Sequence, residues 1–173
     1  MSACKKRQTK ETCIEVLLDI EGSATIKIDT EIPLLDEILS ALARGAGFDL
    51  TLTARGDTET GDHHTTEDAA ITLGSALAQE IKSGIGSSTV PSGQALATAA
   101  VRFGEPGYRG SFALESQFLG GMALENFGHF LRALAYNGRF NLIITAEGGN
   151  DMSKIEAMSM ALGRALKKAA QDR

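Results

Sequence analysis

The chain has 173 residues, of which 43% are hydrophobic, and its 17 Lys+Arg against 22 Asp+Glu give a formal net charge of −5. This length and apolar content are enough for the core of one soluble domain. Because the basic residues are scattered over an acidic chain, we expect no basic face and no nucleic-acid partner. The longest apolar run, residues 95–101, is far shorter than the roughly 20 residues of a membrane span. The chain starts with polar residues, unlike a signal peptide, so we expect a cytoplasmic protein without a membrane partner.

The first half of the chain predicts five elements. Residues 11–20 alternate apolar and polar side chains, and residues 24–29 do so again after a turn, which together predicts a β-hairpin. A proline near a first turn and apolar residues at helical spacing predict a helix over 32–42, ended by glycines. Residues 48–54 predict another strand and residues 64–81 a longer helix. The order is therefore strand, strand, helix, strand, helix.

The second half repeats parts of the first. Residues 42–50 match residues 134–142 at a constant offset of 92, with Leu, Ala, Phe and Leu coinciding. Residues 73–77 match residues 162–166 at an offset of 89, so the loop between the two matches is shorter in the second half. Repeats of this kind indicate a duplicated supersecondary unit.

The repeat predicts an α/β (α+β) fold of two β-β-α-β-α halves. We place the halves at about residues 7–90 and 91–173, divided near Val90 and Pro91. Helices on one face of each small sheet leave apolar faces uncovered, so the halves should pack together as a single domain.

The densest group of functional side chains is the segment 62–68, which opens the longer helix. On a helix, His63 and Glu67 are four residues apart and His64 and Glu67 three, so imidazole and carboxylate share a face. Such mixed nitrogen and oxygen ligands suit Mn, Fe or Zn. The alternative is that Asp62 caps the helix and the two histidines are solvated. We interpret His129, which stands among aromatic residues, as structural.

At this segment the sequence resembles imidazoleglycerol-phosphate dehydratase, the manganese-dependent enzyme of histidine biosynthesis. The resemblance covers nearly the whole chain and includes an R-x-T-x-E-T-like opening at residues 7–12 and the specific D-H-H-T-T-E-D motif at 62–68. Shorter matches occur at residues 34–36, 47–50, 73–74, 148–150, 156–157 and 164–166.

The resemblance implies a duplicated fold like that of ribosomal protein S5 domain 2, and a dinuclear manganese site built from the H-H-x-x-E of each half. It also implies a large homo-oligomeric cage with sites between subunits, and dehydration of a small phosphorylated imidazole substrate by a hydro-lyase reaction. It assigns metal ligation to His63, His64, Glu67 and Glu156, proton transfer to Glu11, and substrate binding to Arg7 and Asp62.

The chain departs from the family pattern at most of the remaining site positions. Where the family has histidine, this chain has Glu37, Gly45, Ile143, Met152 and Ser153. Where the family has its phosphate-binding arginines and lysine, this chain has Gly86, Ser87 and Met160. Thioether and hydroxyl groups are poor ligands for a hard divalent ion. We therefore expect a depleted active site that is weakly active or inactive, with Mn²⁺ at a partial site to which Glu37 could add an oxygen ligand.

Two alternatives remain open. The chain could be a non-catalytic, cage-forming scaffold, natural or engineered. Residues 84–89 also resemble the G-L-G-S-S phosphate loop of small-molecule kinases, which would make the chain a phosphate-binding module. A plain turn between the halves is the structural interpretation of the same residues.

Overall fold

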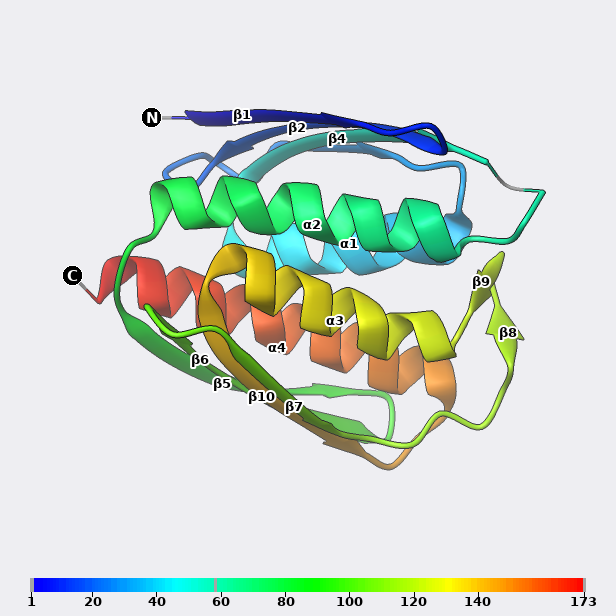
Figure 1. The fold of residues 1–173 in the computed structure, drawn as a ribbon. Helices are drawn as coiled ribbons and strands as arrows, with labels where there is room; N and C mark the ends of the chain where they lie inside the picture. The colour runs from blue at the N-terminus through cyan, green and yellow to red at the C-terminus, as the bar shows by residue number, and fades with distance from the viewer. Residues whose placement is uncertain (1, 58, 173) are drawn as a thin grey trace.

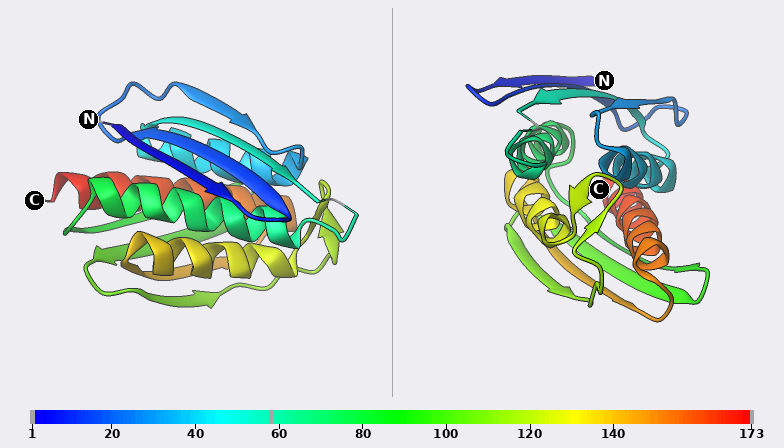
Figure 2. Two further views of the ribbon diagram at one scale, coloured as in Figure 1. Left: turned by 45° about the horizontal axis from the view of Figure 1, so that its top comes forward. Right: turned by 90° about the vertical axis from the view of Figure 1, so that its right-hand side faces the viewer.

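Two four-stranded sheets form the outer layers of the molecule, and four helices fill the space between them (Figures 1 and 2). The computed structural model describes residues 2–57 and 59–172. The first half contains β1 (Ser2–Gln8), β2 (Thr12–Asp19), β3 (Ile26–Asp29), α1 (Pro33–Ala46), β4 (Asp49–Gly56) and α2 (His63–Glu80). The second half contains β5 (Ile85–Ser92), β6 (Ala95–Phe103), β7 (Gly107–Ser111), β8 (Phe118–Leu119), β9 (Met122–Ala123), α3 (Glu125–Gly138), β10 (Phe140–Glu147) and α4 (Asp151–Gln171).

The two halves have the same topology. The strand orders are β1-β2-β4-β3 and β5-β6-β10-β7, so in each sheet the fourth strand lies between the second and third. Buried apolar side chains of both halves form one continuous cluster. The duplicated α/β fold is thus confirmed, with one more sheet strand in each half than the sequence predicted and, in the second half, the additional two-stranded pair of β8 and β9. The expected division near Val90 and Pro91 falls inside β5.

The predicted hairpin of residues 11–20 with 24–29 is wrong. β2 pairs antiparallel with β1 and β4, whereas β3 pairs parallel with β4. The helix α1 connects β3 to β4 and returns the chain to the same end of the sheet, which makes the two strands parallel. Alternation of side chains identifies a strand but does not identify its partner. β1 was missed because it is an edge strand rich in lysine and arginine, as edge strands often are.

The segment 84–89, considered as a phosphate loop, is instead the start of β5, an extended edge strand. Its glycine at position 86 has a packing role, because an added Cβ would lie 2.0 Å from the backbone oxygen of Ala165 on α4. The backbone of β5 therefore lies directly against α4. A strand in this arrangement does not form a phosphate cradle.

Each helix pairs with one helix of the other half, and α4 also packs closely on β5 and β6 of its own sheet. α2 lies against α3 on one side of the molecule and α1 against α4 on the other, as the right-hand view of Figure 2 shows. The predicted start of α1 at a proline is confirmed, whereas the helix extends beyond residue 42 through Gly45 to Ala46 and ends before Gly47, which has the left-handed conformation. Among the described residues, no helix is long and apolar enough to cross a membrane.

Candidate functional site

The N-terminal turns of α2 bring the predicted histidine and glutamate side chains together. His63 Nε2 lies 3.3 Å from Glu67 Oε2, one helical turn away, and both side chains are about half exposed. The rings of His63 and His64 have centroids 5.7 Å apart. The spacing argument for a shared imidazole and carboxylate face on this helix is therefore confirmed in its geometry.

A fourth group, His129 on α3, reaches the same surface. Its ring centroid is 6.1 Å from that of His63, and the two rings meet edge to face. His129 is exposed and, with Glu67, lines a depression of about 260 Å³ between α2 and α3. The interpretation of His129 as a packed structural residue therefore differs from what is seen. No spacing along the chain relates His129 to α2, because only the packing of the two helices brings them together.

The orientation of the His63 ring is fixed by a buried polar chain. Asn126 Nδ2 donates to Asp62 Oδ2 at 3.0 Å, so its Oδ1 is the atom that lies 3.1 Å from His63 Nδ1. An amide oxygen only accepts, so this network assigns the proton to Nδ1 and turns Nε2 toward Glu67. Metal-binding histidines commonly donate their other ring N–H to such a partner.

Asp62 is buried and engaged on both oxygens. Besides the Asn126 amide, its carboxylate accepts the Thr66 hydroxyl at 2.8 Å and the backbone N–H of Ala123 at 2.9 Å. The resemblance assigned Asp62 to substrate binding, and the alternative was a helix cap. In this structure its side chain instead connects the start of α2 to β9 and α3, and it makes no capping bond to a backbone N–H of α2.

Glu11 and Arg7 belong to a second network at the turn between β1 and β2. Arg7 Nε donates to Asp68 Oδ1 at 3.0 Å, and the Thr12 hydroxyl donates to the other oxygen of Asp68. Thr9 Oγ1 accepts the backbone N–H of Glu11 at 3.1 Å and donates to its carboxylate at 3.2 Å. Asp68 therefore anchors this turn to α2, and the turn presents Glu11 to solvent.

Glu156 lies on the other side of the molecule from the histidines. It stands on α4 and lines, with Glu37 on α1 and with Met152, a small pocket between these two helices. The pocket volume is about 10 Å³, which is at the lower limit for one water molecule. The contact between α1 and α4 thus brings a carboxylate of each half to one pocket, and no imidazole lines that pocket.

The residues present do not complete a metal centre within one chain. Among residues 2–57 and 59–172, no group of three or more His, Cys, Asp or Glu side chains is placed to hold a metal ion. The donors on α2 and α3 have the right chemistry for Mn²⁺, but those on α1 and α4 are carboxylates beside a thioether. Within one chain, the described side chains therefore do not by themselves form the dinuclear site expected from the resemblance, which places such sites between subunits.

Asp151 plays the role in the second half that Asp62 plays in the first. At the start of α4, its carboxylate accepts the backbone N–H groups of Glu115 and Ser116, each at 2.8 Å. These bonds, chiefly that from Glu115, hold the pKa of the Asp151 carboxyl below its usual range. These bonds attach the segment between β7 and α3 to the start of α4.

We expect Asp151→Asn to reduce stability at pH 7 by about 1–3 kcal/mol, because the two N–H groups bond to different carboxylate oxygens and asparagine replaces one of these with an NH₂ donor. Since the folded-state pKa is depressed, the wild-type contribution is present above about pH 3.9, the unfolded value, and is lost as the pH falls through the folded-state pKa. Thermal unfolding followed from pH 6 to pH 2.5 should show the two proteins converging below pH 4. A constant difference over this range would contradict the assignment.

Comparison with known proteins places the chain in a family. The family model described as imidazoleglycerol-phosphate dehydratase matches residues 30–166. The imidazoleglycerol-phosphate dehydratase of Desulforudis audaxviator is 43% identical over 173 residues, covering 96% of this chain and 88% of that protein. The protein of the same name from Methanocaldococcus jannaschii is 40% identical over 164 residues, covering 92% of this chain and 83% of that protein.

Two solved structures of dehydratases with this name have the same fold. The Staphylococcus aureus protein superimposes with a TM-score of 0.81 at 27% identity, covering 98% of both chains. The Pyrococcus furiosus protein gives a TM-score of 0.83 at 30% identity, covering 97% of this chain and 94% of the other. The chain belongs to the imidazoleglycerol-phosphate dehydratase family of histidine biosynthesis.

Proposed function

We propose that this chain is a dehydratase-family member whose active site is depleted, with very slow or no turnover of imidazoleglycerol phosphate. The observation that carries the proposal is the pocket between α1 and α4, where Glu37 and Met152 stand at positions that resemble family histidines, beside the retained Glu156. Both carboxylates are exposed, and no imidazole is among the residues that line this pocket. Half of the family's metal chemistry is therefore missing.

We propose that the α2 and α3 surface offers donors for a partial metal site, although these donors do not surround one ion within a single chain. We assign His63, His64 and Glu67 as its ligands, and the ring distance adds His129 to them. In the family, the metal stabilises negative charge that develops on the imidazole of the substrate. In this chain, the Asn126 amide orients His63, while Glu11 stands on its anchored turn as the carboxylate that would move a proton.

Substrate binding is weakened as well as metal binding. The positions that resemble the family's phosphate-binding arginines are Gly86 and Ser87 on β5, and Met160 on α4 replaces a lysine. Charge-assisted hydrogen bonds of this kind contribute roughly 1.5–3 kcal/mol each. Arg7 and Asp62 remain as the proposed substrate contacts, but both already make ion pairs or hydrogen bonds within the chain.

Metal content tests this proposal directly. After saturation with Mn²⁺ and removal of free ions by gel filtration, we expect at most one ion per chain. Chelator treatment should leave the helical circular dichroism unchanged, because the core is continuous and neutral side chains at emptied sites do not destabilise a fold. Two tightly held ions per chain would overturn the proposal, and so would unfolding on chelation.

We further propose a large homo-oligomer in the cytoplasm, following the family. Several large apolar side chains are exposed in the single chain, among them Leu17, Ile85, Leu96 and Tyr136. Such surface is normally covered by subunit contacts. Light scattering at micromolar concentration should therefore give a mass of many chains, or of a smaller ring if the emptied site stops assembly. A monomer would contradict both forms, and an oligomer without turnover would support the alternative of a non-catalytic scaffold.

A further inference from the structure

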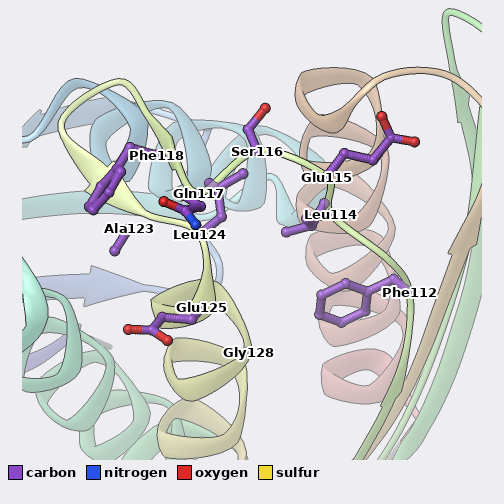
Figure 3. A pocket seen from close by; sticks show the side chains of 10 residues that line it. All are labelled: Phe112, Leu114, Glu115, Ser116, Gln117, Phe118, Ala123, Leu124, Glu125 and Gly128. Carbon is purple, nitrogen blue, oxygen red and sulfur yellow. The ribbon is translucent and has the colours of Figure 1, made fainter.

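A pocket of about 550 Å³ lies at the end of the molecule where the helices begin, between α3 and the segment that leads to it. Phe112 and Leu114 line one side, Phe118 and Ala123 the other, and Gln117 stands between them (Figure 3). Its volume is within the range of about 300–1,000 Å³ typical of small-molecule sites. It is separate from the depression between α2 and α3 and from the pocket between α1 and α4.

The rim of this pocket is held in place before any ligand arrives. The carboxylate of Asp151 fixes the backbone at Glu115 and Ser116, and that of Asp62 fixes Ala123. The Leu124 N–H donates to the backbone oxygen of residue 117 at 2.9 Å, which closes the loop carrying β8 and β9. A pocket whose walls are already ordered loses little entropy when it binds.

A second set of contacts fixes the inner wall. The ring of Phe112 packs edge to face against buried Phe127, with centroids 5.7 Å apart. Gly128 lines the same wall, and an added Cβ there would meet only the Tyr108 hydroxyl at 4.0 Å. The absence of a side chain at this position therefore leaves space for a ligand beside α3.

Two carboxylates give the pocket its charge preference. Glu115 and Glu125 stand on opposite sides of it, are exposed, and pair with no cation in the part of the chain that the structure describes (Figure 3). Lys154 is the neighbouring cation, with its Nζ bonded to the Ala113 carbonyl oxygen at 3.1 Å. The starts of α2, α3 and α4 add about half a positive charge each. These do not offset the four carboxylates of Glu115, Glu125 and the two anchoring aspartates.

We propose that this pocket binds a small organic cation, an ammonium group carried on an aromatic or aliphatic body of about ten non-hydrogen atoms. The apolar side chains would cover the body, and the two glutamates would receive the charge. The proposal is independent of the depleted metal site, since none of these residues belongs to it.

Saturation-transfer NMR titrations with three matched probes test the charge preference, and they work equally well on a large assembly. The probes are 2-phenylethylammonium, 2-phenylethanol and 3-phenylpropionate, which share a ring and chain but differ in charge. We expect saturable binding of the cation with a Kd on the order of 1 mM, as its size allows. The alcohol should bind at least about fivefold more weakly and the anion not detectably.

Three variants locate the binding. Gly128→Leu fills the open space beside α3 and should weaken the binding of the cation at least about tenfold. The variant should remain folded, because leucine is more favourable than glycine inside a helix. Gly128→Ala is a smaller change that should weaken the binding of the cation less, and it replaces the leucine variant in the test if that variant misfolds. In the double variant Glu115→Gln with Glu125→Gln, the cation should bind only as tightly as the alcohol does. Gln79→Leu, at the far end of α2, is the control and should bind like the wild type.

The proposal fails if the wild type binds no probe saturably, or binds the alcohol or the anion as well as the cation. It also fails if both Gly128 variants, folded by circular dichroism, bind the cation like the wild type. Because no metal or substrate is present in these titrations, neither result bears on the proposed depletion of the active site.

Discussion

The purified chain, supplied with excess Mn²⁺ and imidazoleglycerol phosphate, is expected to form product at least about 10⁴-fold more slowly than a family member with a complete site. A loss of about 5.5 kcal/mol of transition-state stabilisation is enough for this factor. Loss of one metal's contribution alone amounts to several kcal/mol. Missing phosphate contacts lower turnover as well as affinity, because remote binding energy is used to position the reacting groups.

Restoring histidines on α1 and α4 should recover part of this rate. We expect Glu37→His with Met152→His and Ser153→His to raise the metal content and to increase turnover by about 10²-fold, which corresponds to about 2.7 kcal/mol. Gly45→His is left out, because a Cβ at Gly45 would lie 2.5 Å from the Met160 backbone oxygen on α4. That substitution would separate α1 from α4.

Glu37→Gln with Met152→Leu and Ser153→Ala is the matched control, since it changes the same positions without adding imidazole. It should neither bind more metal nor turn over faster. If the unmodified chain formed product at an ordinary enzymatic rate, the depleted-site proposal would be wrong, and Glu37 and Glu156 would be working ligands of a different metal centre.

Most elements of the first half could be predicted from the sequence, but β1 and several of the contacts between elements could not. Helical spacing and helix-ending glycines located α1 and α2 to within a few residues, since these signals are local. The pairing of β3 with β4 is not local, because it depends on how α1 carries the chain between them. β1 gave no signal because its alternation is hidden by charged residues on an exposed edge.

The candidate site divides in the same way. His63 and Glu67 could be joined by their spacing on one helix, and the structure places them in contact. His129 and Asn126 reach His63 only because α3 packs on α2. Asn126, for example, is 63 residues away from His63 along the chain. The offset of 92 between the repeats makes Glu37 the counterpart of His129. That correspondence is the signal that could have drawn attention to His129.

The helix pairs also depend on two glycines that the repeat brings to equivalent positions. Gly74 on α2 and Gly163 on α4 match at the offset of 89, and each faces the helix of the other half that it packs against. A Cβ at Gly163 would lie 2.1 Å from the Leu42 backbone oxygen on α1. A Cβ at Gly74 would lie 2.9 Å from the Leu134 backbone oxygen on α3. Side chains can rotate away from such contacts, but backbone oxygens can move only with their helices.

Gly163→Ala is therefore expected to destabilise the fold by about 3 kcal/mol, near the upper end for overpacked cores. In a chain of this size the melting temperature should fall by roughly 5–10 °C. Gly74→Ala should have a smaller effect of the same sign, because its contacts are less severe. Gly128→Ala is the control, since its Cβ enters open space and should gain up to about 1 kcal/mol from helix propensity. Thermal unfolding that ranked the three variants otherwise would show that α1 and α4 can separate without cost, and that the glycine match between the repeats has no packing role.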